Sequence, residues 1–345
     1  MRRFDVAVVG CGVMGAATAR SLARRGPNVV AFERFEVGHD RGSSHGPARI
    51  FRFSYRAPQY VEMAQQALPM WRGLESEADE PFFTTTGGLD MGAGIDGNVA
   101  ALTQCGATFE MLDGGEARRR WPTVKFDPQD EVLYQPDAAL IAADRAWNAF
   151  VQSARERGAA IEEQRRVTEL VDRSDGVVLK VDDEEIRADV CVVTAGAWSK
   201  PLLERAGIEL DVSPSLETIV YLKAPGPPLP LVEWGSPAAF ALPSLGYGDD
   251  VIRTGFHIAG PTTDPETEGT VEPAAVAEVV DWVTRRIEDV DPSPVVTETC
   301  IYTNTDDEHF VLERHGGIVV GSPCSGHGFK FAPLIGERLA DLALS

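Results

Sequence analysis

The stretch DVAVVGCGVMGAATARSLA, residues 5–23, decides how the rest of the sequence is interpreted. A short apolar run leads into a turn that contains Gly10, Gly12 and Gly15, and a segment rich in Ala and Leu follows. This order predicts a strand, a tight turn and a helix. Glycine suits the turn, the close approach of backbone to a pyrophosphate and the contact between helix and strand, while free N–H groups at the helix start bind phosphates.

A second strand and an acidic residue complete the pattern. Residues 29–32 are apolar and end at Glu33, about 20 residues after the glycines, where a carboxylate can accept a ribose hydroxyl. A lone GxGxxG pattern is a weak signal. Strand, glycines, helix, strand and terminal acid in this order favour a dinucleotide site, and both NAD and FAD remain open at this point.

The composition argues against several classes of protein. The chain has 345 residues, of which 43% are hydrophobic, so it can bury a large core, and its length predicts two compact units. A formal net charge of −21 argues against nucleic acid or an anionic membrane as a partner, because both are bound through clustered Lys and Arg. No run of about 18 apolar residues occurs, and no apolar signal segment precedes the first strand, so we expect a cytoplasmic protein.

The five cysteines are scattered and show neither CxxC nor His/Cys ligand spacing. A disulfide framework and a zinc site are therefore not predicted. The acidic residues lack the spacing of a calcium-binding loop, so we expect no metal site. Cys11 is interpreted as a small residue in a tight loop. Cys300 lies in the polar run TETCIYTNTDDEHF, residues 297–310, and is the cysteine that invites a chemical interpretation.

Later segments return to the α/β pattern after a long interruption. The stretch GHDRGSSHGPARIFRFSY, residues 38–55, reads as a loop, and an intermittent stretch with short strands follows the next helix. Residues 188–199 and 317–344 each lead from an apolar strand into a glycine turn. The region 212–302 is expected to be mainly β. Helices are predicted over residues 60–78, 146–157 and 276–287.

Five stretches carry a resemblance to a known family. They are VVGCGVMGAATARSLARRG (8–26), GSSHGPARIFRFSY (42–55), VTAGAWS (193–199), TCIYTNTDDEHF (299–310) and CSGHGFKFAPLIGE (324–337). Together they are similar to the monomeric sarcosine oxidase and N-methyltryptophan oxidase group, within the D-amino acid oxidase superfamily of flavoproteins, and the resemblance extends over nearly the whole chain. It implies FAD as the cofactor and an α/β plus α+β fold, in which a Rossmann-like FAD-binding domain carries an inserted, mainly antiparallel β-sheet substrate domain.

The two domains are expected to alternate along the chain. Three separated segments, residues 1–81, 139–210 and 307–345, are expected to form the FAD-binding domain. Two insertions, residues 82–138 and 211–306, are expected to form the substrate and catalytic domain. The resemblance also implies a monomer.

The resemblance implies which residues contact FAD. Cys300 is the expected attachment point, through a thioether to the flavin 8α-methyl carbon, which requires an activated thiolate rather than an inert core thiol. The loop of Gly326, His327 and Gly328, with the helix after it, is expected to stabilise negative charge at the N1–C2=O edge of the flavin, His327 through its backbone. The other expected FAD contacts are Gly10, Gly12, Val13, Met14, Gly15, Glu33, Arg34, Ser43, His45, Arg49, Val167, Ala195, Gly196, Trp198 and Lys330.

The implied reaction is oxidation of a secondary amine, an N-methyl or cyclic amino acid, to an imine that water hydrolyses, with O₂ reduced to H₂O₂. Arg52 and Lys330 are the expected clamp for the substrate carboxylate, one as a fork donor and the other as a point charge. The resemblance places Arg49 beside the flavin ring, and His257 and Tyr302 in the substrate pocket. Taken alone, such residues are more often surface charges, a structural histidine and a core tyrosine.

Three positions depart from the family pattern. Ala48 replaces a threonine, Phe240 replaces a pocket tyrosine, and Arg253 replaces a lysine that promotes reaction with oxygen. A pocket without these two hydroxyls is more apolar, which suits a bulkier or cyclic substrate. Arg253 leaves the electron acceptor open. A dehydrogenase that uses a non-oxygen acceptor, and a flavoprotein subunit without turnover, therefore remain alternatives to an oxidase.

Overall fold

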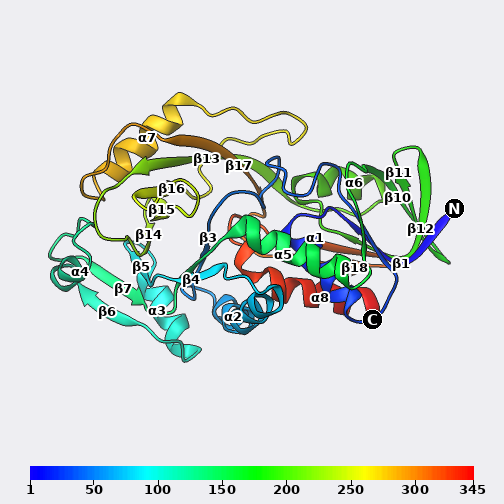
Figure 1. Ribbon diagram of the computed structural model, residues 1–345, viewed down its shortest axis with the longest axis horizontal. Helices are drawn as coiled ribbons and strands as arrows, with labels where there is room; N and C mark the ends of the chain where they lie inside the picture. Colours follow the sequence, from blue (N-terminus) through cyan, green and yellow to red (C-terminus); the bar gives the residue numbers. More distant parts are fainter.

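The computed structural model describes residues 1–345 (Figure 1). It contains two large β-sheets, and β1 lies in the middle of the first. Strands β9, β2, β1, β12 and β19 run in parallel in that order. The inner part of β1 is a continuous buried apolar run, as expected of a parallel strand covered on both faces. Antiparallel β10 and β11 extend the sheet beside β12, and β18 extends it beside β19. The strands are β1 (Arg2–Val9), β2 (Val29–Phe32), β9 (Ala160–Glu162), β10 (Val167–Arg173), β11 (Gly176–Val181), β12 (Glu184–Val193), β18 (Val311–His315) and β19 (Ile318–Ser322).

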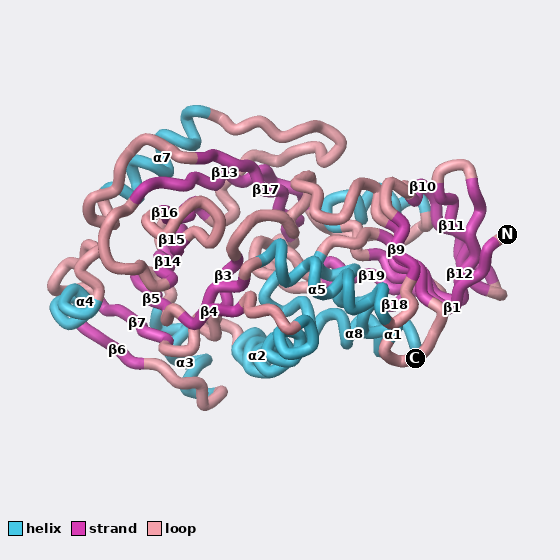
Figure 2. Tube along the Cα trace, viewed as in Figure 1, coloured by secondary structure: helices cyan, strands magenta, loops and turns pink.

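α1, α5 and α8 pack on one face of the first sheet, α2 packs on α5 and α8, and together they form the largest core of the protein (Figure 2). α8 lies directly against α1, and Gly336 permits this approach because a Cβ there would lie 2.6 Å from the backbone carbonyl carbon of Ala17. α6 covers the opposite face, where its leucines join a second core. The helices are α1 (Val13–Ala23), α2 (Pro58–Ala78), α5 (Ala143–Glu156), α6 (Ser199–Arg205) and α8 (Ala332–Leu344).

The second large sheet is mainly antiparallel, with the order β17-β13-β16-β15-β14-β5-β7-β6 and one parallel pair, β14 with β5. α7 (Pro273–Thr284) packs on one face, where Val220 and Leu222 of β13 point. Ile219 and Tyr221 point to the other face, which contacts a small third sheet. The strands are β5 (Gly88–Met91), β6 (Glu110–Asp113), β7 (Glu131–Gln135), β13 (Ser213–Lys223), β14 (Leu231–Gly235), β15 (Ala238–Pro243), β16 (Val251–Phe256) and β17 (Val296–Asn304).

The third sheet joins the two larger parts of the molecule. Its order is β3-β8-β4, and both pairs are antiparallel. β3 carries Arg49 and leads directly to Arg52. Short helical turns at Gly196–Trp198 and Phe329–Phe331 follow β12 and the glycine loop after β19. The remaining elements are β3 (Arg49–Phe51), β4 (Phe83–Thr85), β8 (Ala139–Ile141), α3 (Ile95–Gln104) and α4 (Gly114–Arg120).

The sequence predicted the long helices correctly and missed several shorter elements, among them β3, α3, α4, α6 and the antiparallel pair β10–β11. The helices expected over 60–78, 146–157 and 276–287 are α2, α5 and α7, each displaced by a few residues. β3 lies within the stretch expected to be a loop, and α3 and α4 lie within the stretch expected to hold short strands. α4 had a signal that could have revealed it: Asp113 caps its N-terminus by accepting a hydrogen bond from the backbone N–H of Glu116, 2.8 Å away.

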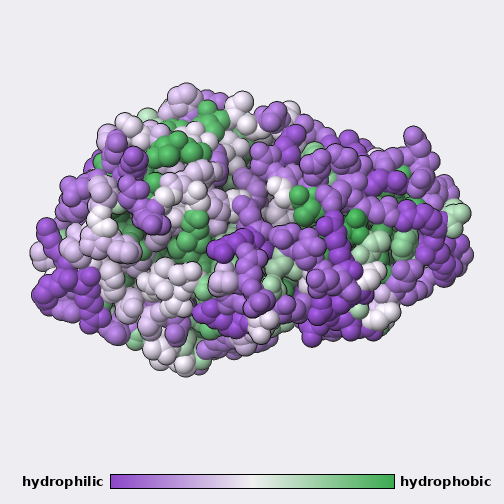
Figure 3. Space-filling model, in the orientation of Figure 1, coloured by the Kyte–Doolittle hydropathy of each residue, from purple (hydrophilic) through white to green (hydrophobic).

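The mixed α/β fold with a second, mainly antiparallel sheet is confirmed, and the division into two domains remains a proposal. The first sheet draws its strands from residues 2–32, 160–193 and 311–322, and the second from residues 88–135 and 213–304. Polar residues cover most of the face shown in Figure 3, with apolar residues in scattered groups. None of the helices combines the length and the apolar composition that crossing a membrane requires.

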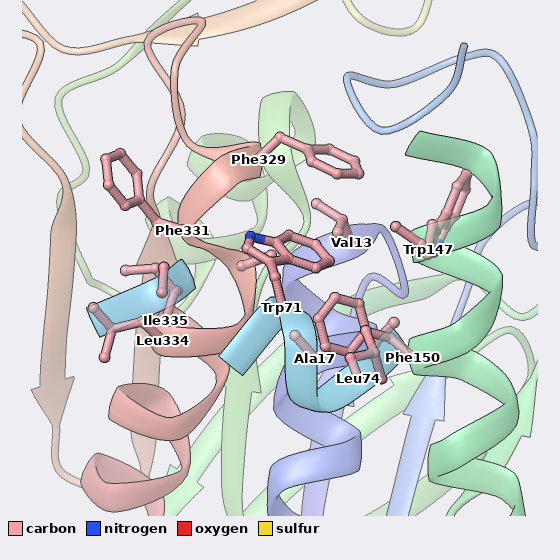
Figure 4. Packing of buried hydrophobic residues seen from close by; sticks show 14 of the residues in the cluster. Val13, Ala17, Trp71, Leu74, Trp147, Phe150, Phe329, Phe331, Leu334 and Ile335 are labelled. Atoms are coloured by element: carbon pink, nitrogen blue, oxygen red, sulfur yellow. The ribbon is translucent and has the colours of Figure 1, made fainter. Parts of the chain in front are cut away.

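Trp71 connects the helical core to the glycine loop that follows β19 (Figure 4). Its side chain is fully buried on α2, and its indole Nε1 donates a hydrogen bond to the backbone carbonyl of Lys330, 2.8 Å away. The indole lies parallel to the ring of Phe329 at a centroid distance of 6.1 Å. Trp282 in the second sheet's core offers a contrast, because it is also buried in apolar surroundings, at 7% exposure, but its Nε1 has no hydrogen-bond partner.

We predict that Trp71→Phe destabilises the protein more than Trp282→Phe. Both changes remove a similar volume, but only the first leaves a buried carbonyl without its donor, at a cost of about 1–3 kcal/mol. Urea unfolding followed by far-UV circular dichroism measures both free energies of unfolding. Equal losses in the two variants would contradict the importance of the hydrogen bond.

Candidate active site

A single large cavity of about 980 Å³ lies between the two large sheets. The turn after β1, the ends of β2 and β12, the residues after β3 and the loop after β19 all contribute to its wall. The second sheet contributes side chains from β5, β14, β15, β16 and β17. Segments far apart in the sequence thus meet around one space, and the residues expected to bind a dinucleotide and a substrate share it.

Two glycines of the turn after β1 have different reasons to be glycine. Gly10 has a positive φ of 88°, and a Cβ there would lie 2.8 Å from the carbonyl oxygen of Thr194, so the fold itself requires glycine. Gly12 has a negative φ, and the only neighbour of an added Cβ would be the side chain of Ser44, 3.0 Å away. A side chain at Gly12 therefore requires only a small shift of the Ser44 hydroxyl, which accepts from the Val13 N–H at 3.0 Å, and the close approach of a ligand is a second reason for glycine.

Gly15 and His45 do not line the cavity, unlike the other residues expected to contact the cofactor. A Cβ at Gly15 would lie 1.8 Å from the carbonyl oxygen of Gly10, so this glycine allows α1 to start close to the turn. The backbone carbonyl of His45 accepts a hydrogen bond from Arg49, and burial, together with the nearby Arg49 charge, lowers the pKa of the His45 ring to about 4.

The acid at the end of β2 supports the turn directly. Glu33 is buried, and one carboxylate oxygen accepts from the backbone N–H of Cys11 at 2.8 Å, while the other accepts from that of Phe35 at 3.0 Å. Arg34 beside it forms a two-pronged ion pair with Glu266, at 2.7 and 2.8 Å. Glu266 also pairs with Arg166 at 3.0 Å, and it comes from the segment between β16 and α7. All three charged residues border the cavity.

Arg49, Arg253 and Cys300 form an electropositive part of the cavity. Arg49 donates only to backbone carbonyls, among them that of Ser43 at 2.9 Å, and the Nε of Arg253 has no hydrogen-bond partner. Neither guanidinium forms an ion pair with a carboxylate. Burial raises the pKa of the Cys300 thiol, whereas the nearby charges of Arg49 and Arg253 lower it. Buried positive charge without a counterion fits the electron-accepting ring of a flavin, on which negative charge develops.

Arg52 and Lys330 lie together in another part of the cavity. Both approach the ring of Tyr55, the Arg52 guanidinium to 4.2 Å and the Lys330 ammonium to 5.6 Å from its centroid. Burial and the neighbouring Arg52 charge lower the pKa of Lys330 to about 7, so this ammonium depends on a nearby anion for its charge. The Arg52 Nε lies 2.5 Å from the Oε2 of Glu233, a partner that no sequence motif had indicated.

His257 and Tyr302 lie against the loop after β19. Their rings are 5.7 Å apart, and Gly326 fits between them, since a Cβ there would lie 2.2 Å from Tyr302 and 2.6 Å from His257. The His257 Nε2 is 3.8 Å from a carboxylate oxygen of Glu308, and this interaction lowers the pKa of Glu308. The His327 ring stacks on Phe310 at 4.7 Å, and burial keeps its pKa well below the usual value, which fits a packing role for the side chain.

The cavity brings most of the expected residues together and adds several that the sequence had not indicated. Expected residues that line it are Gly10, Gly12, Val13, Met14, Glu33, Arg34, Ser43, Arg49, Arg52, Val167, Ala195, Gly196, Trp198, Arg253, His257, Cys300, Tyr302, Gly326, His327, Gly328 and Lys330. Among the additional charged or reactive residues are Asp90, Glu233, Glu308 and Cys324. No spacing signal could have found the first two, because their meeting depends on how distant strands pair.

We predict that Gly12→Ala folds normally but loses the dinucleotide, because the added methyl group would occupy the space that the backbone leaves for the pyrophosphate. The flavin-to-protein ratio after gel filtration measures retention, and far-UV circular dichroism checks the fold. Gly42→Ala is the matched control: Gly42 also lines the cavity, but an added Cβ would meet only a His39 side-chain atom at 3.5 Å. Retention of the dinucleotide by Gly12→Ala would contradict the role of this glycine.

Comparison with known proteins agrees with the cavity's chemistry. Residues 5–342 match the DAO family, described as FAD dependent oxidoreductase. A monomeric sarcosine oxidase from Streptomyces avermitilis is 32% identical, with 99% of this chain and 94% of that protein covered. The peroxisomal sarcosine oxidase of Homo sapiens is 30% identical, with 99% and 92% covered.

A solved structure is similar over the whole chain. The open form of NikD, described as an unusual amino acid oxidase essential for nikkomycin biosynthesis, has a TM-score of 0.90 and 27% sequence identity, and the match covers 100% of this chain and 95% of that one. The fold and the sequence point to the same family. The chain therefore belongs to the DAO family of FAD-dependent oxidoreductases, and its cofactor is FAD.

Proposed function

We propose that this protein oxidises the secondary amine of an N-methyl or cyclic amino acid to an imine, which water then hydrolyses, with O₂ as the electron acceptor and H₂O₂ as its product. The observation that carries the proposal is the pair of cations, Arg52 and Lys330, in the same cavity as the FAD-binding turn. The names of the sarcosine oxidases and of NikD, an amino acid oxidase, support the same class of substrate.

Each part of the cavity has a task in this reaction. Arg52 and Lys330 hold the substrate carboxylate and so fix the position of the carbon to be oxidised. Phe240 and Tyr302 provide apolar walls, and with Ala48 behind them the pocket favours a bulkier or cyclic amine. When bound, FAD accepts a hydride equivalent from the carbon next to nitrogen and passes the electrons on. The positive charges of Arg49 and Arg253 stabilise the negative charge that this transfer creates.

Arg253 favours one alternative, a dehydrogenase with another electron acceptor. The first electron given to O₂ creates a negative charge that a compact ammonium stabilises better than a planar guanidinium. Arg253 is buried between Phe240, whose ring centroid is 5.4 Å from its guanidinium carbon, and its cross-strand neighbour Tyr221. This position gives the charge little freedom to approach O₂. A subunit without turnover is the weaker alternative, because the clamp residues are present.

A monomer in the cytoplasm completes the proposal. The name of the Streptomyces avermitilis relative supports the monomer. The human relative is named as peroxisomal, so the proposed compartment rests on the sequence alone.

We predict that anaerobic addition of N-methyl or cyclic amino acids bleaches the visible absorbance of the flavin, whereas their decarboxylated analogues do not. Arg52→Ala or Lys330→Met should lower kcat/KM, because each loses roughly 2–5 kcal/mol of transition-state stabilisation, the range for leaving a buried charge unpaired. Arg56→Ala is the control, because this arginine lines the same cavity but is exposed. Absence of bleaching with every amine favours the subunit, and bleaching followed by slow recovery in air favours the dehydrogenase.

We also propose that Cys300 holds FAD through a thioether to the flavin 8α-methyl carbon. Cys300 lines the FAD cavity. Burial raises the pKa of its thiol overall, and the adjacent charges of Arg49 and Arg253 oppose this and favour the thiolate in part. Forming the C–S bond removes one hydrogen from the thiol and one from the methyl carbon, and the two electrons leave through the flavin to the acceptor that serves turnover.

For this attachment we predict a yellow acid precipitate and an intact mass that exceeds the polypeptide mass by one FAD less two hydrogens. Cys300→Ser should release the flavin into the supernatant. Cys324→Ser, the matched control at the other cysteine of the cavity, should keep the flavin bound. A white wild-type pellet, or release of flavin by Cys324→Ser alone, would show that Cys300 is not the attachment point.

A further inference from the structure

Two carboxylates lie side by side in the wall of the cavity. Asp90 on β5 and Glu233 on β14 are direct neighbours in the parallel pair of the second sheet. Both line the cavity, Asp90 is 8% exposed, and the Glu233 side chain is 21% exposed. Like charges at directly opposed positions repel one another, so this arrangement requires compensation.

Arg52 supplies the compensation and is fastened to the same structure. Its Nε lies 2.5 Å from the Glu233 Oε2, as described above. Gln135 donates to Asp90 at 2.6 Å, and its side-chain oxygen accepts from the backbone N–H groups of Phe53 and Ser54, at 2.9 Å each. These two residues follow Arg52 in the chain. Gln135 therefore ties Asp90 to the backbone that follows Arg52, while the Arg52 side chain is paired with Glu233 by charge and not by a hydrogen bond.

This assembly changes what the carboxylate clamp can bind. A substrate carboxylate needs Arg52, but Glu233 already occupies it, so entry of the substrate brings three carboxylates to one guanidinium. Burying three carboxylates beside one guanidinium leaves excess negative charge, which is unfavourable unless a positive charge enters as well. The other charged or titratable groups around Arg52 are Tyr55, Lys330, Glu308 and His327. Burial keeps the pKa of His327 well below its usual value, so only the Lys330 ammonium could contribute a positive charge.

We propose that Glu233, backed by Asp90, is a specificity-determining residue that makes this pocket bind a carboxylate only together with one positive charge. An amino acid brings that charge as its ammonium group. The ammonium N–H bond then breaks, the proton forms an O–H bond on the acid pair, and the amine is left neutral with the lone pair that oxidation at carbon requires. This inference rests on the proposed function, because it assumes that the clamp binds the carboxylate of the substrate.

The direction of the pH dependence follows from Asp90. Burial and the adjacent Glu233 raise the pKa of Asp90 to about 7, so the acid pair already holds a proton below that pH in the free protein. Binding of a further anion raises this pKa more. A carboxylate without an ammonium group must therefore take a proton from solvent above pH 7, and its affinity falls about tenfold per pH unit there. A ligand with a fixed positive charge needs no proton and shows no such fall.

The test compares two ligands of similar shape on the FAD-loaded protein. Benzoate carries a carboxylate alone, and N-methylpyridinium-3-carboxylate carries a carboxylate and a fixed positive charge. Perturbation of the flavin absorbance between pH 6 and 9 gives each Kd, and calorimetry in buffers of different ionisation enthalpy gives the number of protons taken up. We expect benzoate to take up about one proton at pH 8.5, and the pyridinium ligand none.

The variants identify the group that takes the proton. Glu233→Gln should abolish the proton uptake and tighten benzoate binding at pH 8.5 by about tenfold, because Arg52 is then free. Glu233→Asp should keep both the uptake and the pH dependence. Glu298→Gln is the matched control: Glu298 bonds Tyr221 and Tyr247 on the same sheet and has no contact with Arg52, so its loss should change neither.

Several outcomes would overturn the inference. Proton uptake on benzoate binding that survives in Glu233→Gln but disappears in Lys330→Met would assign the proton to the lysine. Benzoate binding that is independent of pH in the wild type, or no benzoate binding at all, would also overturn it. The proposed reaction is tested separately by amine bleaching. If amines bleach the flavin but benzoate binding takes up no Glu233-dependent proton, this inference fails and the proposed reaction stands. If benzoate binding takes up the Glu233-dependent proton but no amine bleaches the flavin, the proposed reaction fails alone.

Discussion

The close contact between the turn after β1 and the end of β12 is the constraint on which the site depends. Because Gly10 has no side chain, its backbone rests against Thr194 and Ala195, and the Thr194 hydroxyl donates to the Gly10 carbonyl at 2.9 Å. This contact brings two glycine turns to the same edge of the parallel sheet, where α/β proteins bind nucleotides. Glu33 then fixes the loop from the side of β2. The position of every other wall of the cavity follows from this edge.

The cavity is divided electrostatically into two parts. Around Cys300 the guanidinium groups of Arg49 and Arg253 have no carboxylate partner, so positive charge is available to whatever accepts electrons there. Around Arg52 the charge is already balanced by Glu233. The cavity thus combines an uncompensated positive region around Cys300 with a nearly neutral region around Arg52, which under the proposed function are the flavin side and the substrate side. A pocket with a neutral entrance discriminates by the total charge of a ligand as well as by its shape.

What the sequence could predict was local, and what it missed depends on distant pairing. The glycine turn, the long helices and the context of Cys300 are contiguous patterns, so they identified the fold, the cofactor and part of the cavity wall. Gly15 and His45 were expected at the cofactor and do not line the cavity, because a motif gives residue order and not which residues face a cavity. Glu233 and Asp90 were missed, because only the parallel pairing of β14 with β5 places them together.

The bridge from Glu266 to Arg34 and Arg166 has a consequence for exchange between the cavity and solvent. It joins the segment before α7 to the edge of the first sheet, and its side chains are between 22% and 50% exposed. Attraction between such exposed charges is screened over a Debye length of about 8–10 Å at physiological ionic strength. Opening the cavity at this border breaks ion pairs but leaves the apolar core intact. The rate at which a bound molecule escapes there should therefore rise with salt more steeply than the rate at which the protein unfolds.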